Sequence, residues 1–126
     1  MIRWLSLWGP VFGFMAAVIW LSDDASIAAP EMLSDKLLHL LAFFLFGLAC
    51  MRAFHGGWRL PQLGPSLAAM ALAIGFGAFD EWRQTGVLAR HADLADWVAD
   101  SAGAVLSWLT LRFWPWRSPR ATEEKG

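Results

Sequence analysis

The amino-acid sequence predicts an all-α integral membrane protein, a four-helix bundle with short loops and both termini in the cytoplasm. Hydrophobic residues make up 57% of the 126 residues, charged residues make up only 17%, and the mean hydropathy is positive. Apolar segments recur at lengths that suffice to cross ~30 Å of hydrocarbon as helices. Basic residues collect on one side of these segments and acidic residues on the other, an asymmetry that orients membrane proteins.

We expect one transmembrane domain, residues 1–116, followed by a polar C-terminal tail, 117–126. The predicted spans cover about 4–22, 37–54, 66–84 and 93–114. The fourth is apolar only after Asp100, so three spans with an interfacial helix are the alternative. The first span resembles a secretory signal, but its apolar run exceeds the usual ~7–15 residues and is rich in tryptophan. We therefore expect it to remain as a span.

With four spans, the N-terminus, the loop near 55–65 and the tail share one side. This side holds seven of the ten basic residues: Arg3, Arg52, Arg59, Arg112, Arg117, Arg120 and Lys125. The opposite side holds nine of the eleven acidic residues: Asp23, Asp24, Glu31, Asp35, Asp80, Glu81, Asp93, Asp96 and Asp100. The positive-inside rule then places both termini in the cytoplasm. Tryptophans near both predicted interfaces agree with these boundaries, because their amphipathic rings favour that depth.

Two polar stretches meet on the acidic side. "SDKLLH" (34–39) enters the second span, and "FDEWRQTGVLARHADLADWVAD" (79–100) joins the third to the fourth. Residues four apart share a helix face, which pairs Asp35 with His39 and Asp80 with Gln84. One stripe of the fourth helix carries Asp93, Asp96, Asp100, Gly103 and Ser107, and the third helix has a comparable line in Ala73, Gly77, Asp80 and Gln84. We expect both stripes to point into the bundle, because a charge facing lipid costs about 2.5–3.5 kcal/mol at mid-membrane.

Some of these residues also have a purely structural interpretation. Ser34 is a candidate N-cap with Asp35 in the first helical turn, where the helix dipole favours an acid. Asp93 is a second candidate N-cap, with Asp96 as its capping-box partner. The loop histidines His55 and His91 and the apolar Cys50 are expected to have no functional role.

Asp80 and Glu81 are harder to explain as structural residues. They lie in the last turns of the third helix, where the helix dipole disfavours acids. Their charge must be offset by Arg83, by Arg90, by a protonated His39, by a bound cation, or by neutralisation of one carboxyl group. His39 is suited to act as an acid or base near neutral pH.

Candidate catalytic residues are His39, Asp80 and Glu81. The candidate binding set is Asp35, Lys36, His39, Asp80, Glu81, Gln84, Arg90, Asp96 and Asp100. Clustered carboxylates can share a proton or hold a divalent cation, and Lys36 and Arg90 can meet a phosphate. The sequence identifies no cofactor and no unmistakable nucleophile, and it is compatible with both a binding and a catalytic role. The sparse basic side argues against nucleic-acid binding.

Three motifs resemble those of the VanZ-like family of small bacterial membrane proteins. Asp35-Lys36-x-x-His39 opens the second span and Asp80-Glu81-x-x-Gln84 closes the third. An Arg-x5-Asp-x3-Asn-x2-Gly pattern, which leads into the fourth span, is matched by Arg90, Asp96, Asp100 and Gly103. The resemblance covers roughly residues 30–110. Asp100 stands where the family usually has asparagine, which puts in question any role that needs a neutral amide.

The resemblance implies a multi-pass protein of the bacterial cytoplasmic (inner) membrane with a link to the cell envelope and glycopeptide tolerance, and it supplies no agreed reaction. One hypothesis is an extracytoplasmic-facing site that binds or modifies an envelope component, such as a phosphate-bearing lipid. The alternative is a non-catalytic accessory subunit packed against a larger membrane complex. Gly9 and Gly13 form a GxxxG motif that would let another helix approach closely.

Overall fold

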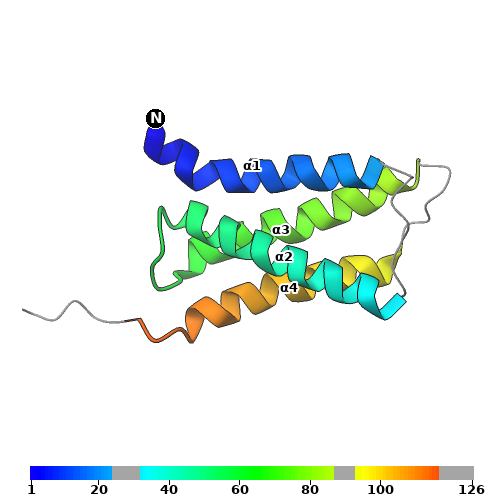
Figure 1. Cartoon of the computed structure of the whole chain (residues 1–126). Helices are drawn as coiled ribbons and strands as arrows, with labels where there is room; N and C mark the ends of the chain where they lie inside the picture. Colours follow the sequence, from blue (N-terminus) through cyan, green and yellow to red (C-terminus); the bar gives the residue numbers. More distant parts are fainter. Residues whose placement is uncertain (24–31, 87–92, 117–126) are drawn as a thin grey trace, which may run out of the picture.

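Four α-helices make up the described part of the chain in the computed structural model, which covers residues 1–23, 32–86 and 93–116. They are α1 (Ile2–Asp23), α2 (Met32–Phe54), α3 (Leu63–Gln84) and α4 (Leu94–Arg112) (Figure 1). No strand occurs in these three ranges. The predicted all-α class with four helices is confirmed.

The helices alternate in direction, so the start of α1, the α2–α3 connection and the end of α4 lie at one end of the molecule (Figure 1). Two hydrogen bonds tie this end together. Arg3 Nη2 donates to the carbonyl oxygen of Gly56 at 3.2 Å, and Arg52 Nη1 donates to the carbonyl oxygen of Ser6 at 2.6 Å. The other end is formed by the start of α2, the end of α3 and the start of α4, where the sequence places its acidic stretches.

α2, α3 and α4 pack on one another, whereas α1 contacts α2 and α3 but not α4. Glycine brings the backbones of α2 and α4 together. A Cβ atom on Gly103 would lie 2.8 Å from the backbone nitrogen of Phe44 and against the carbonyl oxygen of Leu40. Across the same contact, a Cβ atom on Gly47 would lie 2.9 Å from Ser107 Cβ. Any side chain at Gly103 would therefore force these two helices apart.

Phenylalanine rings fill the space between α1, α2 and α3. Phe46 is fully buried, and its ring stacks on Phe14 of α1 with the centroids 4.4 Å apart. Phe43 and Phe76 meet Phe46 edge-on, with centroid distances of 5.7 and 5.5 Å. Edge-to-face and offset stacking are the arrangements that aromatic pairs prefer. This group of rings anchors α1 on the other helices.

The outward faces of the helices are strongly apolar. On α2, for example, Leu37, Leu41 and Leu45 are 56%, 50% and 62% exposed. Three of the described helices are long and apolar enough to cross a membrane, α1 over Ile2–Leu21, α2 over Asp35–Phe54 and α3 over Leu63–Gln84. α4, which has two aspartates in its first half, is not among the helices that qualify as spans by length and composition. An exposed surface of this kind is suited to lipid rather than to water.

Two helix starts differ from the prediction. α2 begins at Met32, five residues before the predicted span, so Ser34 lies inside the helix and the N-cap prediction is wrong. Asp35 does lie in the first turn, as expected. α3 begins at Leu63 rather than at 66, with Pro65 in its first turn. Proline is tolerated there because the first N–H groups of a helix have no acceptor within the helix.

The start of α4 is as predicted. Asp93 is its N-cap, and Asp93 Oδ1 accepts a hydrogen bond from the backbone nitrogen of Ala95 at 2.9 Å. The ends of α2 at Phe54 and of α3 at Gln84 also agree with the predicted spans. The polar tail, 117–126, lies outside the described residues.

Candidate functional site

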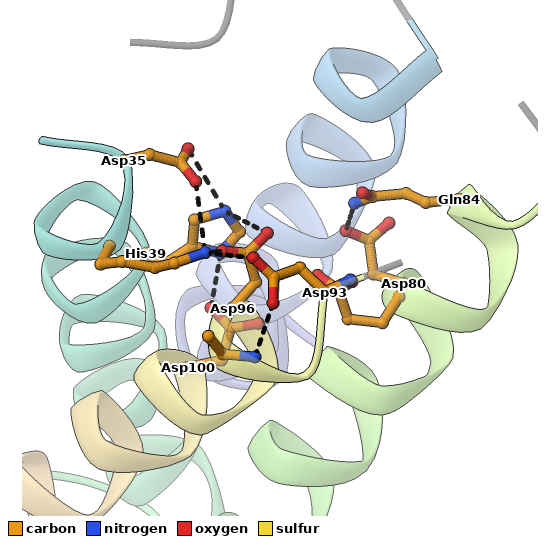
Figure 2. A network of polar contacts seen from close by, with 10 residues as sticks. Asp35, His39, Asp80, Gln84, Asp93, Asp96 and Asp100 are labelled. Atoms are coloured by element: carbon orange, nitrogen blue, oxygen red, sulfur yellow. Dashed lines mark hydrogen bonds and ion pairs between the residues drawn. The ribbon is translucent and has the colours of Figure 1, made fainter. Parts of the chain in front are cut away.

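Polar side chains from three helices converge where α2 begins, α3 ends and α4 begins (Figure 2). We call these residues the polar cluster: Asp35, Lys36 and His39 from α2, Asp80, Glu81 and Gln84 from α3, and Asp93, Asp96 and Asp100 from the N-cap and first turns of α4. The cluster contains every residue of the predicted binding set except Arg90, which lies outside the described residues. Asp93, expected as an N-cap and as part of the polar stripe, is an addition to that set.

Lys36 joins α2 to the start of α4. Its Nζ donates hydrogen bonds to Asp93 Oδ2 at 2.6 Å and to Asp96 Oδ1, and lies 3.8 Å from Asp35 Oδ2. The hydrogen bond from Lys36, helped by the N–H of Ala95, lowers the pKa of the Asp93 carboxyl group. An ammonium group already surrounded by three carboxylates is poorly available to a phosphate.

His39 is held from one side by a buried acid. Its Nδ1 lies 2.8 Å from Asp100 Oδ1, and Asp100 is only 2% exposed. On the other side of the ring, Nε2 lies 3.8 Å from Asp35 Oδ1 and 3.8 Å from Asp96 Oδ2, beyond hydrogen-bonding distance (Figure 2). In the tautomer that donates Nδ1–H to Asp100, Nε2 keeps a lone pair that can accept a proton or a ligand.

The acids at the end of α3 have partners that offset the unfavourable helix dipole. Gln84 Nε2 donates to Asp80 Oδ2 at 3.0 Å, and Arg83 Nε lies 3.8 Å from Asp80 Oδ1. The backbone nitrogen of Asp93 donates to Glu81 Oε2 at 3.0 Å. A capping box would give this N–H to Asp96 instead, so the predicted capping box is wrong. Glu81, not Asp96, completes the N-terminus of α4.

Glu81 nevertheless retains an unused oxygen. The residue is 8% exposed, and its Oε1 has no hydrogen-bond partner among the described residues. Buried polar atoms nearly always find a partner, because a missing one costs roughly 1–3 kcal/mol. Either a ligand or a proton is needed to complete this carboxyl group.

Small residues beneath the polar cluster let the helices close around it. A Cβ atom on Gly77 would lie 3.2 Å from Asp100 Oδ2 and 3.3 Å from Phe43 Cε1. The inward ends of the two predicted stripes are buried: Ala73, Gly77, Asp80 and Gln84 on α3, and Asp100, Gly103 and Ser107 on α4. The prediction that these faces point into the bundle is confirmed for these residues, whereas Asp93 at the outer end of the stripe is exposed.

The polar cluster carries an excess of negative charge. The described parts of α2, α3 and α4 bring six carboxyl groups together: Asp35, Asp80, Glu81, Asp93, Asp96 and Asp100. The permanent cations beside them in these helices are Lys36 and Arg83. Such a site favours cations over anions, because neighbouring carboxylates raise the energy of each other's charged form.

Two overlapping groups in the cluster offer ligand atoms that lie within 4.8 Å of one another. The first is Asp35, His39 and Asp96, all partly exposed, and the second is His39 with the buried acids Glu81 and Asp100. Imidazole nitrogens and carboxylate oxygens are both ligands of divalent metal ions.

Comparison of the chain with protein-family models, with curated proteins and with solved structures gives no match. The resemblance to the VanZ-like family therefore depends on the motifs that form the polar cluster.

The residues set apart as structural behave differently from His39. His55 directly follows α2, as expected, but it is buried, with Nδ1 2.8 Å from the carbonyl oxygen of Met51 and Nε2 2.9 Å from the backbone nitrogen of Gln62. Cys50 is fully buried, which confirms its interpretation as a core residue. His91, Asp24 and Glu31 lie outside the described residues. The contact between Asp93 and Lys36 was not predicted. Asp93 lies three residues before Asp96, and this spacing lets both acids reach one cation.

Proposed function

We propose that the chain is a VanZ-like protein of the bacterial cytoplasmic membrane whose polar cluster faces the outside and binds a component of the cell envelope, with a link to glycopeptide tolerance. The observation that carries this proposal is the setting of His39. Its Nδ1 is anchored on buried Asp100, while Nε2 lies 3.8 Å from one oxygen each of Asp35 and Asp96, close enough for an ion pair with a charged ring but too far for a hydrogen bond. If the cluster served only to hold the helices together, the hydrogen bonds of Lys36 to Asp93 and Asp96 would suffice to join α2 to α4.

The orientation of the protein is supported by charge. Arg3, Arg52, Arg59 and Arg112 lie at the end opposite the polar cluster, and this end would face the cytoplasm. In this arrangement α4 would be the fourth span, with its aspartates turned inward against α2 and α3. The apolar faces of the bundle would contact the lipid bilayer.

Binding is favoured over turnover in this proposal. His39 has the anchoring carboxylate that orients a general acid or base, as a second group does in catalytic dyads. No serine, threonine or cysteine hydrogen-bonds to it within the described ranges, so an activated nucleophile is lacking there. Acid–base work by His39, Asp80 or Glu81 would need a reacting group supplied by the ligand.

The test is analysis of small molecules and lipids that copurify with the protein. Wild-type protein and His39→Ala are purified from bacterial membranes in a mild detergent and examined by native mass spectrometry. The expected result is an envelope lipid or precursor retained by the wild type and lost from His39→Ala. His55→Ala is the matched control, because that histidine uses both nitrogens within the fold at the opposite end. The same bound molecules on wild type and His39→Ala would contradict the proposal.

A second candidate function, as an accessory subunit of a larger membrane complex, is favoured by α1. A Cβ atom on Gly9 or Gly13 would meet nothing within 4 Å, so the GxxxG motif packs against no other helix in the described part of the chain. Such motifs let a helix of another protein approach closely. Gly9→Leu with Gly13→Leu should then abolish copurification of a stoichiometric partner. Gly75→Leu, at an equally open position on α3, is the control.

A further inference from the structure

We propose that His39, Glu81 and Asp100 form a binding site for a divalent transition-metal ion of the Zn²⁺ type. The inference deepens the proposed function and rests on it for the ligand that the ion would meet. The three side chains come from three different helices, α2, α3 and α4. Their ligand atoms lie within 4.8 Å of one another.

The unused oxygen of Glu81 is the observation that points to a ligand. Its Oε1 has no hydrogen-bond partner among the described residues, although the side chain is more than nine-tenths buried. The other oxygen, Oε2, is fixed by the backbone N–H of Asp93, so the carboxylate is held in place. A fixed carboxylate with one unused oxygen beside a histidine and a second buried acid is preorganised for a cation.

The charges and donor types match such an ion. A neutral imidazole with two carboxylates carries two negative charges, which a divalent ion neutralises. The mixed nitrogen and oxygen donors favour Zn²⁺ or similar ions over Mg²⁺ and Ca²⁺, which take oxygen ligands. Bonds of about 2.0–2.2 Å in a tetrahedral site hold the ligand atoms roughly 3.4 Å apart. His39 Nδ1 and Asp100 Oδ1, now 2.8 Å apart, would therefore separate slightly to admit the ion. Three protein ligands also leave a coordination position for a further molecule.

Metal binding requires one proton to move. In the described geometry the hydrogen bond between His39 Nδ1 and Asp100 Oδ1 contains a proton, and the ion would take its place. The displaced proton moves to Nε2, so the ring stays neutral, and this N–H faces the carboxylates of Asp35 and Asp96, each with an oxygen 3.8 Å from Nε2. Carboxylates in this position orient metal-bound histidines in many proteins. The two outer acids would therefore support the site without binding the ion.

The alternative group, Asp35, His39 and Asp96, is less suitable because a cation already lies there. Lys36 Nζ bonds to Asp96 and lies 3.8 Å from Asp35. A divalent ion beside this ammonium group would be repelled by it. Neither Glu81 nor Asp100 contacts a lysine or arginine among the described residues. The inner group is therefore the one that lacks a positive charge.

A metal ion would also explain how an acidic site accepts a phosphate-bearing ligand. Six carboxylates repel a phosphate, and Lys36 is engaged by its own acids. An ion with an open coordination position can bind a phosphate oxygen and reverse the local sign of the charge. The ligand class that this site would take is thus an anionic oxygen, carried by a lipid head group or an envelope precursor.

The experiment measures metal binding to full-length protein in detergent after removal of metals with EDTA. Zn²⁺ binding is followed by calorimetry and metal analysis, and Co²⁺ binding by its visible absorption. We expect about one Zn²⁺ per chain, no comparable binding of Mg²⁺, and a Co²⁺ spectrum that indicates a nitrogen ligand. Glu81→Gln should weaken Zn²⁺ binding by at least on the order of 100-fold, more than loss of a supporting residue does.

Asp35→Asn is the matched control, because this acid also lies beside His39 but outside the proposed ligand set. It should retain the single Zn²⁺ with a loss of affinity of about 10-fold, at the lower end of the effect of supporting residues and smaller than the loss in Glu81→Gln. Asp100→Asn serves as the second ligand variant if Glu81→Gln does not fold, as judged by circular dichroism. No stoichiometric Zn²⁺ in the wild type would overturn the proposal. So would loss of binding in Asp35→Asn with retention in both ligand variants, which would move the ion to the outer group.

This result and the test of the proposed function can fail separately. If Zn²⁺ binds as predicted while His39→Ala retains the same lipids as the wild type, the metal site stands and the envelope ligand does not. If no metal binds while lipid retention depends on His39, the metal site is wrong and the envelope-binding function stands.

Discussion

Asp100 is the residue at which this chain departs from the VanZ-like motif, and it is also one of the most deeply buried polar side chains. Its Oδ1 meets His39 Nδ1, and its Oδ2 lies against the close approach at Gly77. Sequence reasoning placed Asp100 on the inward face of α4 from the position of the stripe. The pairing with His39 was not predictable, because it depends on how far α2 and α4 slide along each other.

We predict that Asp100→Asn folds with little loss of stability, because the amide oxygen still accepts the hydrogen bond from His39. Asp100→Leu should lower the free energy of unfolding by about 1–3 kcal/mol, because it leaves that donor unpaired. Thermal unfolding of both variants in the same detergent tests this. Equal losses for the two would mean that the negative charge, not the hydrogen bond, stabilises the fold.

Lys36 is a counter-ion for the acids of α4, since its Nζ donates hydrogen bonds to Asp93 and Asp96. Lys36→Met keeps the aliphatic chain but leaves Asp93 and Asp96 without their ammonium partner. We expect a loss of about 1 kcal/mol, since the group is partly exposed and water screens part of the interaction. Arg112→Met, an exposed position at the far end of α4, should leave the melting temperature nearly unchanged. A similar small change in both variants would show that Lys36 contributes no net stability.

Among the elements, the contact between α2 and α4 determines how the polar cluster is assembled. The helices themselves were predictable from apolar segments, and every boundary except the starts of α2 and α3 lies within two residues of the predicted spans. The start of α2 was not, because the acidic and polar residues before position 37 lie in the helix rather than in a loop. The packing partners of α1 could not be predicted from the sequence either, because its apolar residues suit contact with lipid and with protein equally well.

Gly103→Ala should destabilise the bundle by about 1–3 kcal/mol or more, because the added Cβ atom meets backbone atoms of α2 that cannot rotate away. Gly75→Ala is the control, because a Cβ atom there meets nothing within 4 Å. It should stabilise α3 by up to about 0.5–1 kcal/mol, through reduced backbone freedom in the unfolded state. Comparable stability of the two variants would show that α2 and α4 are not in close backbone contact.

At the scale of the whole molecule, charge is separated along the bundle. Arg3, Arg52, Arg59 and Arg112 lie at the end with the start of α1 and the end of α4, whereas the carboxyl groups of the polar cluster, with Lys36 and Arg83 beside them, lie at the other end. This separation was readable from the sequence, because alternating helices place successive loops at alternate ends. Which end of the bundle faces the cytoplasm is predicted by the positive-inside rule and not by the packing of the helices.

The proposed function requires that the polar cluster face the extracytoplasmic side of the membrane. Single cysteines at Ala95 and Arg59, both exposed and at opposite ends of the bundle, are introduced into a Cys50→Ala background. Spheroplasts are then treated with a membrane-impermeant maleimide before and after permeabilisation. We predict that Ala95→Cys is labelled in intact spheroplasts and Arg59→Cys only after permeabilisation. Labelling of Arg59→Cys alone in intact spheroplasts would place the polar cluster in the cytoplasm and contradict the proposed function.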